Sequence, residues 1–181
     1  MALIAAQKQV IKGMAAGMVI SITLLLAAAF LGPVMEAQGE ITWRLAFALK
    51  LETATACWLV LSIGLLARHR FFNPEDIDAQ AVSTGSEKAA ILQANLQNTL
   101  EQSVLAILVH LIWASYMPAK YLFVLVAAVA LFIVGRILFL KGYADGAGSR
   151  AVGFAMTFYP SVLLLAVILA RCLIMSVGTS A

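Results

Sequence analysis

The chain has 181 residues, of which 63% are hydrophobic and only 12% are charged. Soluble domains carry about 25% charged residues, so this composition excludes an ordinary soluble protein and predicts a single integral membrane domain over residues 1–181. The net charge of +3 is small and spread over several loops, and the absence of a basic cluster argues against a nucleic-acid partner.

Five apolar stretches are long enough to cross a bilayer, which needs about 20 residues per helix. They cover residues 13–35, 43–67, 90–117, 120–141 and 151–176, and predict an all-α, polytopic helix bundle. The first stretch follows Lys8 and Lys12 and contains Ala27-Ala28-Ala29, a pattern that also fits a cleaved signal peptide. Because the apolar run continues to Met35, we interpret it as a retained helix; cleavage is the alternative.

Basic residues near helix ends predict the orientation of the chain. With five spans, most of them fall on one side of the membrane, and they are Lys8, Lys12, Arg68, Arg70, Arg136, Lys141 and Arg150. The other side has Arg44 and Lys120. Since Lys and Arg are enriched on the cytoplasmic side, we expect a cytoplasmic N-terminus and an external C-terminus.

The third span opens with a stripe of polar residues. On a helix, one broad face carries Gln93, Gln97, Asn98, Glu101 and Gln102. A carboxylate at membrane depth is costly and usually faces the protein interior or a water-filled cavity. The stripe is either a set of helix–helix contacts or half of a ligand site, and the stripe alone does not decide between them.

A second polar group surrounds the turn between the fourth and fifth spans. Arg136, Phe139 and Tyr143 share one face at the end of the fourth helix, and Ser149 is the expected N-cap of the fifth. Arg150 then lies in the first turn, where the helix dipole is also positive. Helix stability does not explain this position, whereas an anion-binding role does.

By the predicted topology, the two polar groups face the same side of the membrane. Together they suit a small zwitterion: Glu101 would bind its amine, Arg136 its carboxylates, and Arg150 a nearby anion such as a thiolate. Tyr143 would donate a hydrogen bond to the sulfur or hold a carboxylate.

The remaining polar residues predict structural roles. Ser86 is expected to begin the third helix and Pro118 to end it. His110 is interpreted as an interior histidine, since it lies too deep to form a metal site with His69. Lys50 and Glu52 are expected to pair with each other or with another helix.

Two motifs give the chain a resemblance to the MAPEG family, the membrane-associated proteins of eicosanoid and glutathione metabolism. One is N-x-x-E, here Asn98 to Glu101; the other is R-x-x-[YF]-x-x-G-Y-x6-R, here Arg136, Phe139, Gly142, Tyr143 and Arg150. The resemblance covers residues 43–176 as a four-helix core, to which the helix over 13–35 is an extra element.

The resemblance implies a homotrimer that binds glutathione near the cytoplasmic face. It implies a glutathione-dependent transferase or peroxidase acting on lipophilic electrophiles or hydroperoxides, in contact with membrane lipid and without a metal. Arg150 would stabilise the glutathione thiolate, and the positions near glutathione would be Asn98, Glu101, Arg136 and Tyr143.

Three residues depart from the pattern of the family's enzymes. Ala94 and Gln102 stand where eukaryotic enzymes often have Arg and Tyr, and Phe139 stands where the second motif often has its first Tyr. The alternative is therefore a non-catalytic membrane protein of the same type that binds lipid or a protein partner.

Overall fold

The computed structural model describes residues 4–35, 40–77, 85–143 and 145–178. These residues form a bundle of five long helices and two short ones, without strands, so the all-α prediction is confirmed. The long helices are α1 (Ala5–Leu31), α2 (Ile41–Phe72), α4 (Glu87–Tyr116), α5 (Val124–Lys141) and α6 (Ala147–Gly178). The short ones are α3 (Pro74–Ile77) and the 3-10 helix η1 (Ala119–Tyr121).

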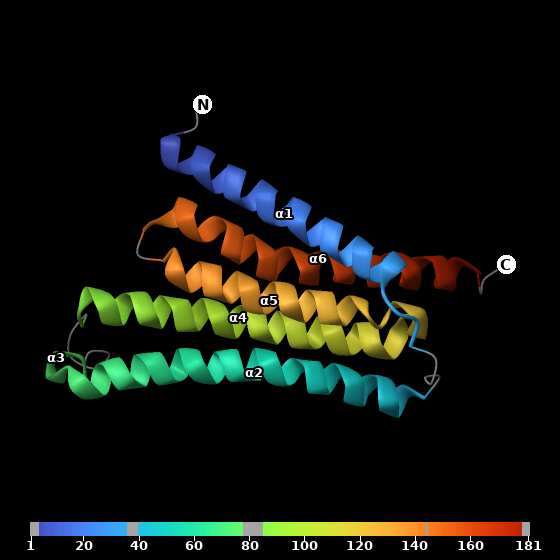
Figure 1. Ribbon diagram of the computed structural model, residues 1–181, viewed down its shortest axis with the longest axis horizontal. Helices are drawn as coiled ribbons and strands as arrows, with labels where there is room; N and C mark the ends of the chain where they lie inside the picture. Colours follow the sequence, from blue (N-terminus) through green and yellow to red (C-terminus); the bar gives the residue numbers. More distant parts are fainter. Residues whose placement is uncertain (1–3, 36–39, 78–84, 144, 179–181) are drawn as a thin grey trace.

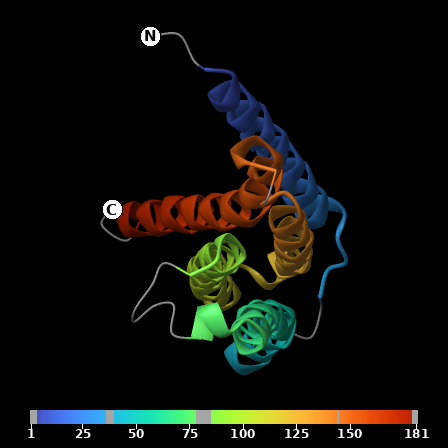
Figure 2. The same ribbon diagram turned by 90° about the vertical axis from the view of Figure 1, so that its left-hand side faces the viewer.

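Successive long helices run in opposite directions, so the two termini lie at opposite ends of the bundle (Figure 1). Seen along the bundle, α1 and α2 lie at opposite edges, with α4, α5 and α6 between them (Figure 2). Helix α1 packs on α6 and α5, and α2 packs on α4 and α5. The start of α1, the end of α2, the start of α4 and the α5–α6 turn therefore share one end, here named the α5–α6 end.

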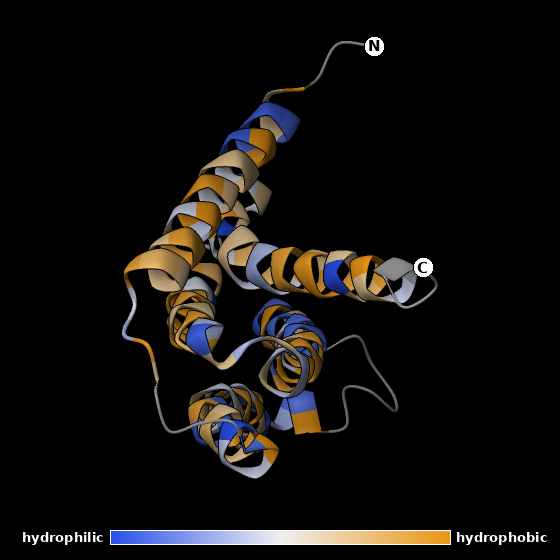
Figure 3. Cartoon of the chain, turned by 90° about the vertical axis from the view of Figure 1, so that its right-hand side faces the viewer, coloured by the Kyte–Doolittle hydropathy of each residue, from blue (hydrophilic) through white to orange (hydrophobic). Residues whose placement is uncertain are grey.

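Four of the five long helices are apolar enough to cross a membrane, over residues 5–31, 41–72, 119–141 and 147–176. Helix α4 is 30 residues long but does not reach this apolar composition, because its first half carries the polar stripe. Hydrophobic residues make up much of each long helix (Figure 3), and many large ones are exposed, for example Phe30, Leu31 and Val60. The chain is an integral membrane protein, and the crossing by α4 stays a prediction.

Helix boundaries follow local hydrogen bonding. The Ser86 hydroxyl accepts from the backbone N–H of Ala89 at 3.2 Å, so its predicted role as the start of the third helix is confirmed. Helix α4 ends one residue before its cap Met117, and Pro118 follows, as predicted. The prediction for Ser149 is wrong, because α6 already begins at Ala147.

Glycine explains this earlier start of α6. Gly146 has φ +96°, a left-handed conformation that disfavours residues with a side chain, and α6 begins directly after it. The Ser149 hydroxyl lies inside the first turn and bonds the carbonyls of Gly142 and Gly146, at 2.7 and 2.8 Å. Ser149 therefore closes the α5–α6 turn.

A buried ionisable pair joins α2 to α4. His110 Nδ1 lies 2.5 Å from Glu52 Oε1, and the two residues are 1% and 5% exposed. The predictions of an interior histidine and of a partner for Glu52 on another helix are confirmed, and the two residues partner each other. Lys50, in contrast, is exposed.

Candidate functional site

A cavity of about 580 Å³ lies toward the α5–α6 end of the bundle. We name it the polar cavity. Its lining comes from α1, α4, α5, α6 and the α5–α6 turn, and consists of Val10, Met14, Ala94, Gln97, Asn98, Glu101, Phe139, Tyr143, Ala147, Arg150, Ala151 and Phe154. Four of the five predicted site residues, Asn98, Glu101, Tyr143 and Arg150, are among them.

Arg150 and Tyr143 form one wall of the polar cavity. The guanidinium carbon of Arg150 lies 4.3 Å from the centre of the Tyr143 ring, a stacking distance for a cation over an aromatic face. Ser149 closes the turn that joins these two residues. Because Arg150 is in the first turn of α6, its charge adds to the positive end of the helix dipole. This wall is suited to an anion.

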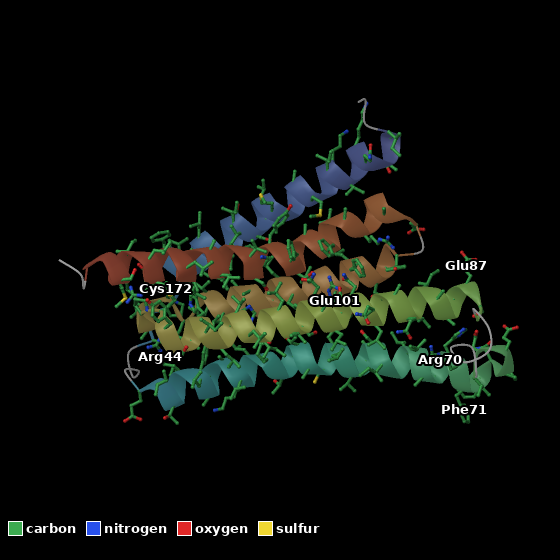
Figure 4. All side chains as sticks on the ribbon, turned by 180° about the vertical axis from the view of Figure 1, so that it is seen from behind. Arg44, Arg70, Phe71, Glu87, Glu101 and Cys172 are labelled. Atoms are coloured by element: carbon green, nitrogen blue, oxygen red, sulfur yellow. The ribbon has the colours of Figure 1, made fainter. Side chains whose placement is uncertain are left out.

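Glu101 lies on the α4 wall, well inside the length of the bundle, between Glu87 at one end and Arg44 at the other (Figure 4). Its Oε1 accepts a hydrogen bond of 2.9 Å from Gln97 Nε2. Glu101 is exposed in the single chain. The polar cavity thus combines a carboxylate on α4 with a guanidinium on α6.

Arg136 does not line the polar cavity, although it is the fifth predicted site residue. It is 1% exposed, with its guanidinium 4.5 Å from the centre of the Phe139 ring. One terminal nitrogen donates to Asn98 Oδ1 at 2.8 Å and the other to Thr157 Oγ1 at 2.5 Å. Within one chain, Arg136 therefore ties α4 to α6 and fixes the Asn98 amide at the cavity wall.

The polar stripe of α4 divides between different surroundings. Gln97, Asn98 and Glu101 line the polar cavity, whereas Gln102 is buried and Gln93 accepts a 3.2 Å hydrogen bond from Arg70 of α2. The five residues span about 180° of the helix at ~100° per residue, and Gln93 and Gln102 stand at the two edges. The stripe serves both as a set of helix contacts and as a cavity wall.

Two of the three departures from the family pattern lie in the polar cavity. Ala94 contributes a methyl group to the α4 wall, and the Phe139 ring packs edge-on against Tyr143 at 5.4 Å. Gln102 is outside the lining. The cavity therefore lacks the donors that Arg at 94 and Tyr at 139 would supply.

Sequence reasoning missed the contribution of α1. Val10 and Met14 line the polar cavity together with Phe154 of α6. Their four-residue spacing places Val10 and Met14 on one face of a helix, but a helix period does not identify the helix that this face meets.

A second cavity of about 550 Å³ lies toward the opposite end of the bundle. We name it the apolar cavity, because none of its lining residues is charged. They are Ile22, Leu25, Leu26, Ala29, Phe30, Trp113, Met117, Tyr121, Val124, Leu163, Leu164, Ala166, Val167 and Ala170. Among the described residues, no cluster of His, Cys, Asp and Glu is arranged to hold a metal ion.

Comparison with known protein families identifies the family to which the chain belongs. The family described as MAPEG matches residues 13–170, from within α1 to within α6. Comparisons with curated proteins and with solved structures found no match. The match includes most of α1. It therefore does not test the division into an extra helix over 13–35 and a core over 43–176, which stays a prediction. The chain belongs to the MAPEG family of membrane proteins.

Proposed function

We propose that the protein is a glutathione-dependent transferase or peroxidase that acts on lipophilic electrophiles or hydroperoxides and binds glutathione in the polar cavity. One observation carries this proposal: Glu101 and Arg150 line the same cavity, and Tyr143 stacks on Arg150. A cavity of this size, with opposite charges on separate walls, fits a small zwitterion.

Three groups of glutathione, namely the amine, the sulfur and one carboxylate, have a matching group at the polar cavity. Glu101 would bind the amine, and Arg150 would lie at the sulfur. Arg136 acts on a carboxylate through Asn98: the Asn98 Oδ1 accepts from Arg136, which leaves the Nδ2 donors for the ligand. Arg136→Ala should accordingly weaken glutathione binding.

Arg150 supplies the chemistry, because the nucleophile is the thiolate and a free thiol has a pKa of about 8.5. A cation within ~4–6 Å lowers the pKa of an anionic group by about 1–3 units. In the transferase reaction the sulfur bonds to an electrophilic carbon, which gives up a leaving group or a π bond. In the peroxidase reaction the sulfur takes one peroxide oxygen and releases an alcohol; a second glutathione then gives the disulfide and water.

The same proposal includes a homotrimer. Helix α4 exposes a row of apolar side chains next to Glu101, namely Leu100, Val104, Leu108 and Ile112, which are 42–55% exposed in the single chain. A neighbouring subunit would cover this row and narrow the opening at Glu101. The mass of the detergent-solubilised protein tests this assembly, and a monomer would contradict it.

Orientation is also part of the proposal, with the N-terminus cytoplasmic and the C-terminus external. The α5–α6 end carries Lys8, Lys12, Arg68, Arg70, Lys88, Lys141 and Arg150, and the opposite end carries Arg44, Lys120 and Arg171. Tags at the two termini should differ in their accessibility from outside the cell. Equal accessibility of both tags would contradict a bundle that crosses five times.

The decisive experiment is the ultraviolet absorbance of bound glutathione. The wild type should bind glutathione at millimolar concentration and show thiolate absorbance, which Arg150→Ala should remove. Arg171→Ala is a matched control, because Arg171 also stacks on a tyrosine, Tyr116, at 5.5 Å. A wild type that binds no glutathione would refute the proposed enzyme.

The second candidate is a non-catalytic protein that binds lipid or a protein partner. Ala94 and Phe139 favour it, because both replace donors in the polar cavity. In that case the purified protein would retain lipid or a partner, and adding glutathione would change neither absorbance nor stability.

A further inference from the structure

The first half of α1 contributes only apolar side chains to the polar cavity. Val10 and Met14 contribute to its lining, while the charged groups come from α4 and α6. We propose that Val10 and Met14 hold the apolar part of the lipophilic electrophile beside the sulfur, and so determine which electrophiles react. This inference rests on the proposed glutathione-dependent activity and names the substrate-selecting residues of the same cavity.

Close backbone contact fixes α1 against α6. A Cβ atom on Gly13 would lie 2.7 Å from the Cβ of Ala151, and one on Gly17 would lie 2.4 Å from the Cβ of Ala155. No larger residue fits at either glycine without moving a helix. Ala151 is the residue after Arg150, so this contact sets the position of Met14 relative to the Arg150 wall.

The direction of α1 opens space beside these residues. Helix α1 lies at an angle to the other long helices, and its first half is the part farthest from α4 (Figures 1 and 4). The polar cavity reaches from Val10 and Met14 on α1 to Ala94 on α4. A ligand in this space contacts the charged residues on α4 and α6 as well as the apolar side chains of α1.

The charged residues of α4 and α6 and the apolar residues of α1 match two different reactants, glutathione and a lipophilic electrophile. Glutathione is charged at both ends, whereas its co-substrate here is apolar apart from the reacting carbon. Methionine is flexible and polarisable, so Met14 can adapt to apolar groups of different shape. Away from the Gly13 and Gly17 contact with α6, Ile11 is 52% exposed and Val19 63% exposed, as expected for a helix face in lipid. Helix α1 thus separates the polar cavity from the membrane lipid, from which lipophilic substrates would come.

The test uses α,β-unsaturated aldehydes that share one reacting group and differ in alkyl chain length. The glutathione sulfur bonds to the β-carbon, the C=C π bond breaks, and the thiol proton ends on the α-carbon, without any net redox change. For Met14→Ala we expect kcat/KM to fall about tenfold for the longest aldehyde and much less for the shortest, because the lost contact is apolar. Val10→Ala should show the same trend with a smaller slope.

Matched variants separate selectivity from folding. Met14→Leu keeps an apolar side chain of similar size and should restore most of the long-chain activity. Met18→Ala removes the same residue type one helical turn later, outside the cavity lining, and should leave the chain-length profile unchanged. All variants are compared with the wild type in the same detergent, so partition of the aldehydes cancels.

The outcomes distinguish the two proposals. A wild type that neither binds glutathione nor conjugates any aldehyde refutes the proposed function. The role of α1 is overturned if the wild type conjugates aldehydes but Met14→Ala and Val10→Ala lower kcat/KM equally for all chain lengths, or do not lower it at all. The role of α1 is supported if Met14→Ala and Val10→Ala lose more kcat/KM for long-chain than for short-chain aldehydes and Met18→Ala does not.

Discussion

The polar cavity and the apolar cavity have nearly the same volume, about 580 and about 550 Å³, and α1, α4, α5 and α6 line both. An arginine also stacks on a tyrosine near each end of the bundle, Arg150 on Tyr143 and Arg171 on Tyr116. The difference is where these groups face. Arg150 and Tyr143 line the polar cavity, whereas Arg171 and Tyr116 are outside the lining of the apolar cavity.

Neither a cavity nor an arginine–tyrosine stack is therefore sufficient to mark a site in this bundle. In the polar cavity, by contrast, an arginine from α6 and a carboxylate from α4 line the same space. Charges away from the cavities, such as the pair of Glu52 and His110, join helices instead. Variants at matched positions can separate these roles.

The largest expected effect is on stability, from breaking the buried pair. Glu52→Ala leaves His110 without its hydrogen-bond partner in a buried site, and an unsatisfied buried polar group costs about 1–3 kcal/mol, in addition to the packing lost with the side chain. We expect the free energy of unfolding in detergent to fall by this amount. Glu75→Ala, at an exposed position on α3, should change it little. Similar unfolding of the two variants would show that charges outside the cavities are not needed for structure.

The next effect concerns the two arginine–tyrosine stacks. If Arg150 lowers the pKa of the glutathione thiol by about 1–3 units, Arg150→Ala should reduce the thiolate fraction at neutral pH by about tenfold or more. Turnover of a small, water-soluble electrophile at saturating glutathione should fall with it. Arg171→Ala should retain wild-type turnover. An equal loss of turnover in Arg150→Ala and Arg171→Ala would show that Arg150 acts by stabilising the fold.

A smaller effect is expected from the carboxylate of the polar cavity. Glu101→Gln removes a charged partner for the amine, and a hydrogen bond to a charged group contributes about 1.5–3 kcal/mol. Because Gln keeps an oxygen that can accept from the amine, only the charged part of this contribution is lost, about 1 kcal/mol, and calorimetric titration should show glutathione binding weakened by about fivefold. Glu75→Gln is the control for loss of a carboxylate. Unchanged binding and unchanged oligomeric mass in Glu101→Gln would remove any special role of this residue.

Much of the arrangement at the polar cavity could be predicted from sequence. Apolar stretches of membrane length alternate in direction, so the start of the third helix and the start of the fifth must share one end. This alone brings Glu101 toward Arg150. The spacing within each helix then places Asn98 beside Glu101, and Ser86 has the chemistry of a cap.

Other features depend on packing that a helix period does not encode. Arg136 falls on the correct face of α5, but its burial requires Thr157 and Asn98 to meet it from two other helices. The partnership of Glu52 with His110 depends on the register between α2 and α4. Gly13 and Gly17 allow close approach, but nothing in the first span shows that α6 is the helix that approaches.

The smallest expected effect lies outside the membrane-spanning segments, at the connection between α2 and α4. The backbone N–H of Ser86 donates to Asp76 Oδ1 at 2.6 Å and is the main cause that lowers the pKa of Asp76 below its ordinary value of 3.8. The Ser86 hydroxyl, at 2.7 Å from Oδ2, and His69, at 2.9 Å, act in the same direction.

A carboxyl group whose pKa is lowered in the folded state stabilises the fold above its unfolded pKa. For Asp76 this stabilisation is complete well above pH 3.8 and is lost as the pH falls through the lower folded value. Asp76→Asn should therefore lower the melting temperature at neutral pH, and its difference from the wild type should shrink under strongly acidic conditions. Glu75→Gln, at the preceding exposed residue, provides the control.

Because Asp76 is not in the lining of the polar cavity, glutathione binding by Asp76→Asn at neutral pH should remain close to wild type. A melting-temperature difference that stays constant with pH would show that the Asp76 charge does not stabilise this connection.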